Sequence, residues 1–471
     1  GGCPYNAWAR DPDGRRDPYC LAYKSMFVAF HRGFISEMDG EQNIRALVEI
    51  PPAKDDHILF RRGPIIDISR GGPHPKQIAR SARRVVASVE LARGASEPGL
   101  EQRLVNLGIC RTLESARNSL IGLRRQVWQP KQVLNNLYLH LTFRCQLNCN
   151  HCYARASVDA TAGREPTSED VVHLVQAARR IGFKKVILTG GEPMLNSDWE
   201  VLLDALDKIR GNISPLKLYL RTNLALPLKD EIISKMASCF DLVGVSVDGD
   251  KELHDLRRGH GTYQITVENL ARCAKVINGK NGSAQLMLAG VLSAADAQGS
   301  PGQMVRELGR KLGIRRVQFR PLLPLGRAQD LPEQPSMLSP ECYDHPFSRL
   351  EAGFIPMTSC GMGQNLYIEP DGQAFPCYAF HKPHSYLGNV LESGLESVLN
   401  SHEFKFLATR TVDTNRKCMN CLYRYLCGGA CRAWGGEATK YDLDAPPQEC
   451  GSLYQAAEAL YQEALSFLEI A

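Results

Sequence analysis

Three cysteines lie close together in the middle of the chain, where their thiols could hold a metal centre. They occur in the stretch Cys145-Gln-Leu-Asn-Cys149-Asn-His-Cys152, directly after an apolar run that is typical of a strand. With these spacings, one short loop can wrap a single iron–sulfur cluster. A cluster of about four irons held by three thiolates keeps one iron free to bind a small bidentate molecule. A structural zinc site is the alternative, although zinc prefers a closed set of four protein ligands.

A second and larger group of cysteines lies near the end of the chain. The chain has 16 cysteines and no apolar segment of the kind found in secretory signals, so we do not expect a disulfide framework. Cysteines that cluster in such a chain indicate metal or cluster ligation, with a pair of zinc knuckles as the alternative. Cys110, Cys239 and Cys273 lie in apolar helical contexts and are expected in the core. The group comprises Cys360, Cys377, Cys418, Cys421, Cys427, Cys431 and Cys450.

Glycine and polar residues follow several predicted strands. The carboxyl ends of parallel strands meet at one edge of a sheet, which is where such sheets bind ligands. Each residue on its own could equally be a turn or cap residue. Together they predict a binding site at that edge, formed by Gly190, Gly191, Glu192, Pro193, Thr222, Asn223, Ser246 and Asp248.

The elements that carry these residues lie in the middle of the chain, where short β-rich runs alternate with amphipathic helices. This alternation predicts a parallel sheet with helical connections. Six units are too few for a closed eight-stranded barrel, so we expect an α/β fold with an open partial (β/α)6 barrel over residues 135–330. Ser168 is the expected N-cap of the first helix. The predicted strands are Leu137–Phe143, Lys185–Thr189, Leu216–Thr222, Leu242–Val247, Ala284–Leu292 and Arg316–Arg320, and the helices are Ser168–Ile181, Trp199–Ile209, Lys229–Ser238, Tyr263–Ile277 and Gly302–Leu312.

Two further regions flank the barrel. Residues 1–134 are expected to form a small α+β region, with strands Ala46–Ile50 and His57–Ile68 and helices Lys76–Arg93 and Leu100–Gln126, similar to a winged-helix module. Twelve Arg and five acidic residues lie between Arg61 and Arg125, which indicates either a solvated face or a docking surface for an acidic partner. Residues 331–471 are Cys-rich and loop-rich, and such a segment needs clusters or metals to hold it together.

The first cysteine group and the strand ends resemble the radical S-adenosylmethionine (radical SAM) superfamily. The resemblance rests on the CX3CX2C spacing between a strand and a helix, and on Gly190-Gly191-Glu192-Pro193 after the next strand. It implies that the glycine-rich motif binds the methionine amino group of the cofactor, and that the polar strand ends contact its ribose and methionine. An Arg in His254-Asp-Leu-Arg257-Arg258-Gly259 would pair with the cofactor carboxylate, and we assign this role to Arg258 rather than Arg257. The implied chemistry is cleavage of S-adenosylmethionine to a 5′-deoxyadenosyl radical that takes a hydrogen atom from carbon.

The second cysteine group resembles the seven-cysteine SPASM pattern of that superfamily. The resemblance implies a Cys-rich auxiliary-cluster domain and three [4Fe-4S] clusters in all. By analogy, Cys418, Cys421, Cys427 and Cys450 hold an outer cluster, and Cys360, Cys377 and Cys431 hold an inner one. Cys342 is the nearest fourth ligand for the inner cluster. Cys3 or Cys20 could serve instead, or the iron stays open for substrate.

The resemblance implies an enzyme that modifies a ribosomally made peptide or small protein, by thioether or carbon–carbon crosslinking. Modification of a small molecule, and an iron–sulfur electron-transfer or scaffold protein, are the alternatives. Sulfatase maturases with this domain carry an Asp base after the cysteine that matches Cys377, whereas this chain has Tyr378, which argues against formylglycine formation. The net charge of +5 is too small to indicate nucleic acid. With no apolar run of membrane-spanning length, we expect a cytoplasmic protein supplied with electrons by a flavodoxin- or ferredoxin-type donor.

Overall fold

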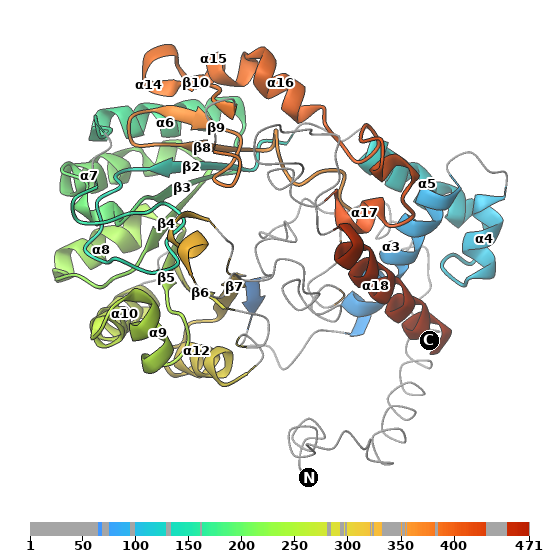
Figure 1. The fold of residues 1–471 in the computed structure, drawn as a ribbon, viewed down its shortest axis with the longest axis horizontal. Helices are drawn as coiled ribbons and strands as arrows, with labels where there is room; N and C mark the ends of the chain where they lie inside the picture. Colours follow the sequence, from blue (N-terminus) through green and yellow to red (C-terminus); the bar gives the residue numbers. More distant parts are fainter. Residues whose placement is uncertain are drawn as a thin grey trace, which may run out of the picture.

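One sheet dominates the computed structural model (Figure 1). The structure describes residues 65–67, 75–94, 99–128, 133–160, 163–279, 284–292, 296, 299–320, 322, 325–331, 350, 354, 356–381, 385–429 and 450–470. Within these ranges the sheet has ten strands in the order β1-β7-β6-β5-β4-β3-β2-β8-β9-β10. No helix in the described ranges is long and apolar enough to cross a membrane.

Six consecutive strands of this sheet are parallel, and helices connect them along its outer face (Figure 1). This confirms the expected α/β class and the open partial (β/α)6 barrel. The strands are β2 (Asn136–His140), β3 (Lys185–Thr189), β4 (Lys217–Thr222), β5 (Leu242–Ser246), β6 (Gln285–Val291) and β7 (Arg316–Arg320). The helices are α6 (Ser168–Ile181), α7 (Trp199–Ile209), α8 (Asp230–Cys239), α9 (Lys251–Arg258), α10 (Thr262–Gly279) and α12 (Ser300–Lys311).

Apolar periodicity explains why these segments form strands and helices. Helices α6, α7, α8, α10 and α12 each contribute an apolar face to the main core, as Val171, Leu174 and Ala178 of α6 do. The predicted N-cap of α6 was wrong by one residue. The cap is Thr167, whose side chain accepts from the Asp170 N–H while Asp170 accepts from the Thr167 N–H. This reciprocal pairing satisfies two backbone donors, which Ser168 as cap would not achieve with the same partner.

The C-terminal region adds strands to the same sheet. Strand β8 (Asn365–Ile368) runs parallel to β2, and β9 (Gln373–Phe375) and β10 (Gly388–Asn389) follow antiparallel. The Asn136 side-chain amide donates to the Asn365 side-chain oxygen over 2.7 Å, which joins the two regions at a buried position. Three short helices, α14 (Val390–Ser393), α15 (Leu395–Asn400) and α16 (His402–Ala408), follow. This region is thus an extension of the barrel sheet.

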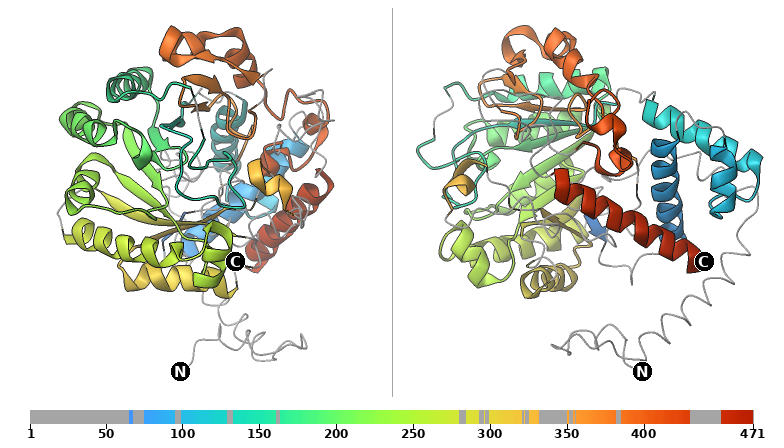
Figure 2. Two further views of the ribbon diagram at one scale, coloured as in Figure 1. Left: turned by 60° about the vertical axis from the view of Figure 1, so that its left-hand side comes forward. Right: turned by 45° about the vertical axis from the view of Figure 1, so that its right-hand side comes forward.

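A second core lies away from the barrel and joins helices of the N-terminal region to the C-terminal region (Figure 2). It contains α3 (Pro75–Arg93), α4 (Leu100–Asn106) and α5 (Leu113–Trp128), packed with α17 (Arg424–Cys427) and α18 (Cys450–Ile470). Buried Cys110 belongs to this core, while Cys239 and Cys273 belong to the barrel core, which confirms all three as core residues. The N-terminal helices therefore share their apolar faces with the C-terminal Cys-rich region.

Two N-terminal expectations need correction. The predicted helix Leu100–Gln126 is two helices, because Gly108 adopts a left-handed φ of 68° and Thr112 starts a new helix by accepting from Ser115. The second correction concerns the predicted strand His57–Ile68, of which the structure describes the short strand β1 (Ile65–Asp67). This strand joins the barrel sheet, where it pairs antiparallel with β7. The predicted strand Ala46–Ile50 lies outside the described residues.

Candidate active site

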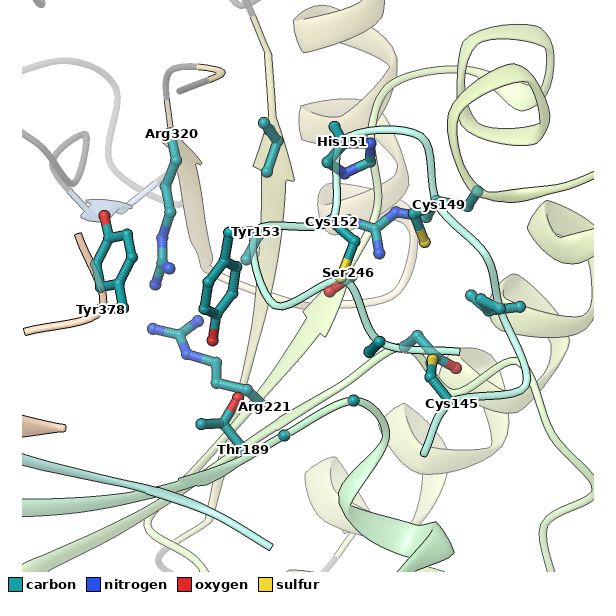
Figure 3. A pocket seen from close by; sticks show the side chains of 18 of the residues that line it. Cys145, Cys149, His151, Cys152, Tyr153, Thr189, Arg221, Ser246, Arg320 and Tyr378 are labelled. Carbon is teal, nitrogen blue, oxygen red and sulfur yellow. The ribbon is translucent and has the colours of Figure 1, made fainter. Parts of the chain in front are cut away.

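A cavity of about 230 Å³ opens at the carboxyl ends of the barrel strands (Figure 3). The first three cysteines line one side of it, on the loop that follows β2. Of the predicted binding residues, Gly190, Gly191, Thr222, Asn223, Ser246 and Arg258 also line it. The topology therefore brings together residues that are far apart in the sequence.

The three cysteine thiols suit a cluster with one open iron. All are free, and Cys145 and Cys149 are buried while Cys152 is partly exposed to the cavity. The Asn223 amide donates to Cys145 Sγ over 3.6 Å, the kind of hydrogen bond that tunes a cluster's sulfur ligands. Burial raises the pKa of the Cys145 thiol to about 12, so cluster binding must release a proton from it. The donor set thus fits an iron–sulfur cluster.

Arg327 holds the cysteine loop. It lies in the 3-10 helix η5 (Gly326–Asp330), which follows the last barrel strand in the sequence. Its guanidinium donates to the carbonyls of Cys149 over 2.7 Å and Ala156 over 2.8 Å, and its backbone N–H donates to Cys152 O. Gly326 lies so close that a Cβ would meet Cys152 O at 2.3 Å. Arg327 was not predicted, because its position after the last barrel strand reveals nothing of these contacts.

The glycine pair after β3 packs against the start of the cysteine loop. A Cβ on Gly190 would meet Thr142 O at 2.5 Å, and one on Gly191 would meet Arg144 O at 2.3 Å. The Gly191 N–H donates to Thr142 O over 2.7 Å. The two glycines therefore allow close approach to the neighbouring backbone, while they also line the cavity.

Glu192 lies behind the cavity wall, and neither it nor Pro193 is among the described residues that line the cavity. The Glu192 carboxylate is fully buried and accepts from the Thr222 hydroxyl over 2.9 Å and the Asn223 N–H over 2.8 Å. Burial raises the pKa of Glu192 to about 7, although these donors oppose the shift. Its side chain therefore ties the ends of β3 and β4 together.

Asp248 also lies behind the wall, where it orients two residues that line the cavity. Its carboxylate accepts from Arg258 Nε over 2.6 Å and lies 3.3 Å from His151 Nε2. Burial opposes ionisation, yet the Arg258 guanidinium holds the pKa of Asp248 well below its usual range. Burial lowers the pKa of His151 to about 4, so Asp248 lies beside a neutral ring. Arg257 points elsewhere, to Val291 O.

The opposite side of the cavity is aromatic and basic (Figure 3). Tyr153, Arg221, Arg320 and Tyr378 gather there, away from Cys145 and Cys149. The rings of Tyr153 and Tyr378 lie 5.2 Å apart, and Tyr153 Oη lies 2.9 Å from His140 Nε2. Burial lowers the pKa of His140 to about 3, so that ring is neutral. These residues were not predicted as site residues, although alternation along β4 and β7 indicates the face that carries Arg221 and Arg320.

The remaining cysteines fall into two places. Cys360 and Cys377 pack against the barrel core, whereas Cys418 and Cys421 pack against the second core, with Cys427 ending α17 and Cys450 starting α18. Within the described ranges, no group of three or more Cys, His, Asp or Glu is placed to hold a single metal ion. Cys431, Cys342, Cys3 and Cys20 lie outside the described residues, so the ligands expected for the inner cluster remain predictions.

Comparison with known families matches two parts of this chain. Residues 139–290 match the radical SAM superfamily, and residues 360–422 match the SPASM iron–sulfur cluster-binding domain. The first match covers the cysteine loop and most of the barrel, and the second covers the strands that extend its sheet. Both resemblances expected from the cysteine spacing are confirmed. Iron–sulfur clusters and S-adenosylmethionine are therefore the cofactors that these domains imply.

Several known proteins are similar to this chain over part or most of their length. A probable GTP 3′,8-cyclase of Pyrococcus abyssi is 28% identical over 30% of this chain, which spans only 44% of that protein. The AdoMet-dependent heme synthase of Methanosarcina barkeri is 26% identical over 65% of this chain and 93% of its own length. The mycofactocin maturase MftC of Mycolicibacterium smegmatis is 25% identical over 66% of this chain and 81% of its own.

Two solved structures share the fold. That of anSMEcpe with bound AdoMet superposes with a TM-score of 0.51 at 19% identity, covering 72% of this chain and 98% of the other. That of Streptococcus suis SuiB bound to S-adenosylmethionine gives 0.51 at 16% identity, covering 76% and 87%. At these identities the likeness concerns the fold.

Proposed function

We propose that this chain, in which a radical SAM domain is followed by a SPASM domain, cleaves S-adenosylmethionine and modifies a ribosomally made peptide or protein. The modification we propose is a crosslink, either a thioether or a carbon–carbon bond. The observation that carries the proposal is one cavity in which three free thiols, the glycine pair and the polar strand ends meet.

Each group around the cavity has a distinct task in this proposal. Cys145, Cys149 and Cys152 would hold a [4Fe-4S] cluster. Ser246 and Arg258 would bind the methionine carboxylate of the cofactor, with Asp248 fixing the guanidinium. When bound, the reduced cluster and S-adenosylmethionine supply the means to take a hydrogen atom from unactivated carbon. Arg327 would hold the cysteine loop in place through its two carbonyl contacts.

Two observations favour a peptide substrate. The SPASM domain is the first, and MftC, a maturase that is similar over most of its length, is the second. Tyr378 beside the cavity, where a sulfatase maturase would carry an acidic base, argues only against formylglycine as the product. In this proposal the later cysteines hold two auxiliary clusters, and an external flavodoxin- or ferredoxin-type protein supplies electrons.

A small-molecule substrate is the second candidate, because the heme synthase of M. barkeri is similar over 93% of its length. The two candidates differ in what they consume. A peptide maturase changes the mass of a short peptide encoded beside its own gene when the two are co-expressed, whereas a small-molecule enzyme leaves that peptide unchanged.

The proposal is tested with the anaerobically reconstituted full chain. We expect about three [4Fe-4S] clusters per chain, and 5′-deoxyadenosine formed from S-adenosylmethionine and dithionite. Replacing Cys145, Cys149 and Cys152 together with Ala should remove one cluster and all cleavage. The matched control replaces the buried core residues Cys239 and Cys273 with Ala, which should leave the iron content unchanged. Full cleavage by the triple variant would refute the proposal.

A further inference from the structure

The cavity is strongly basic. Its described lining includes four arginines, Arg221, Arg258, Arg320 and Arg327, and no acidic residue. Two of the four help to hold the cysteine side of the cavity. Arg258 pairs with the buried Asp248 carboxylate, and Arg327 donates to two backbone carbonyls of the cysteine loop. The other two lie together on the far side, beside Tyr153 and Tyr378 (Figure 3).

Arg221 and Arg320 are brought together by a neutral group. Arg221 ends the inner face of β4, and Arg320 ends the inner face of β7. Both guanidiniums donate to the same side-chain oxygen of Gln318, over 3.4 Å from Arg221 and 3.3 Å from Arg320. Gln318 is buried and uncharged, so it orients the two cations without neutralising either of them.

Arg320 shows most clearly that an anion is expected here. Its Nε is buried and has no hydrogen-bond partner, and it forms no ion pair with a carboxylate in the described part of the chain. Burial also lowers the pKa of its guanidinium. Leaving a cation in such a place is costly unless an anion pairs with it.

The chain makes room for this arrangement at Gly244. Arg221 and Gly244 are paired neighbours on β4 and β5. A Cβ on Gly244 would lie 2.5 Å from Arg221 Nη1 and 3.0 Å from its Cδ. The Arg221 side chain therefore lies across the strand at a point where any other residue would displace it.

We propose that Arg221 and Arg320 bind a carboxylate of the substrate, and specifically the side chain of an Asp or Glu in the peptide. This rests on the function proposed above. Two guanidiniums offer planar, paired donors that match a carboxylate's two oxygens. We assign the cofactor carboxylate to Arg258 instead, because Asp248 holds this guanidinium beside His151 of the cysteine loop. The acidic residue would thus be held where its own carbon can lose a hydrogen atom.

The test uses the reconstituted full chain, S-adenosylmethionine, dithionite and short peptides that carry one fully deuterated residue. The peptides are Ac-Gly-Glu-Gly-NH2, its Asp and Gln counterparts, and Ac-Gly-Gly-Ala with a free carboxyl terminus. Mass spectrometry measures the fraction of 5′-deoxyadenosine that gains deuterium, and calorimetry measures the dissociation constant of each peptide. We expect labelling from the Glu or Asp peptide, and binding about tenfold tighter than for Gln.

Variants show whether the two arginines are responsible. In Arg221→Gln and Arg320→Gln, the labelled fraction and the preference for the acidic peptide should fall together. Gly244→Ala should do the same without removing a charge. Arg315→Gln removes the same charge at an exposed position before β7 and should change neither quantity.

The possible failures are distinguishable. If no 5′-deoxyadenosine forms at all, the proposed function itself fails. If it forms but the acidic and Gln peptides label equally, or none labels, the carboxylate site is refuted and the proposed function stands. Labelling from the free carboxyl terminus alone would also refute an acidic side chain as the ligand.

Discussion

Two buried residues behind the cavity wall hold residues that line the cavity. Asp248 is buried, and it fixes both the Arg258 guanidinium and the neutral His151 ring. Glu192 is buried as well, and it joins the ends of two adjacent strands. Denaturation experiments on variants of Asp248 and Glu192 measure what each residue contributes to stability, apart from any effect on the cofactors.

Replacing Asp248 with Asn should destabilise the chain, because it leaves the buried Arg258 charge without its anion. Breaking one partner of a buried pair costs about 3–5 kcal/mol. Urea denaturation of the full chain measures the loss. The exposed Asp159→Asn serves as the matched control. Removing Arg258 as well should recover part of the loss, and a strictly additive double variant would contradict the pairing.

The stability of the chain should carry a pH dependence from Glu192. Its pKa is about 7 in the folded chain and about 4.3 when unfolded. The folded form holds the proton more tightly, so stability should fall as pH rises from about 4.3 to 7 and change little from this source above that. Glu192→Gln lacks this fall, so its deficit against the native chain should shrink across the same window. Denaturation midpoints at pH 5 and pH 8 check this, and a widening deficit would disprove it.

At the scale of elements, the contact between α3 and α18 depends on Glu90. Its side chain is buried, pairs with Arg103 of α4 at 3.1 Å and accepts from the Tyr461 hydroxyl of α18 over 3.2 Å. Because α17 packs in the same core, this contact also supports Cys427 and Cys450.

Glu90→Ala should therefore lower the melting temperature and loosen the packing around the outer auxiliary site. It removes the carboxylate that Arg93, Arg103 and Tyr461 contact, at a cost of about 1–3 kcal/mol. Thermal denaturation and iron analysis measure the two effects. Glu114→Ala, at an exposed position on α5, should change neither quantity. Unchanged stability in Glu90→Ala would mean that apolar packing alone holds the helices.

At the scale of the whole molecule, the N-terminal helices and the Cys-rich region depend on each other. The Arg424 guanidinium donates to Ala92 O over 3.0 Å, and Phe354 N–H donates to the Ser81 hydroxyl over 3.1 Å. These bonds join the N-terminal helices to the Cys-rich region across the second core. We also predict that residues 1–134 help to recognise a leader or partner.

Deleting residues 1–134 should expose the apolar faces of α17 and α18 and lose the outer cluster, which is about four irons per chain. None of the described residues that line the cavity lies in this region, so a soluble truncated chain should still cleave S-adenosylmethionine. Iron content and 5′-deoxyadenosine yield measure the two outcomes. Full iron content after truncation would show that the C-terminal region folds without the N-terminal helices.

The sequence by itself determined the barrel and the first cysteine site. Strands and helices follow from local apolar periodicity, and β3, β7, α6 and α7 have the predicted bounds. The ligands Cys145, Cys149 and Cys152 lie on one loop, so their proximity is a local property of the chain. The glycine pair and the strand-end residues meet at that loop because parallel strands share one edge.

Only the tertiary structure decided which side chains meet inside the barrel and which helices share the second core. Alternation shows that Arg221 and Arg320 share the inner face, but it cannot show that Gln318 joins them or that Gly244 gives them room. The sequence predicts Glu192 and Asp248 as ligand contacts, whereas the structure shows them as buried residues that support the cavity wall. The shared core of α3 and α18 likewise follows from which apolar faces meet. Apolar pattern specifies that a face is buried, whereas the partner that covers it depends on the path of the whole chain.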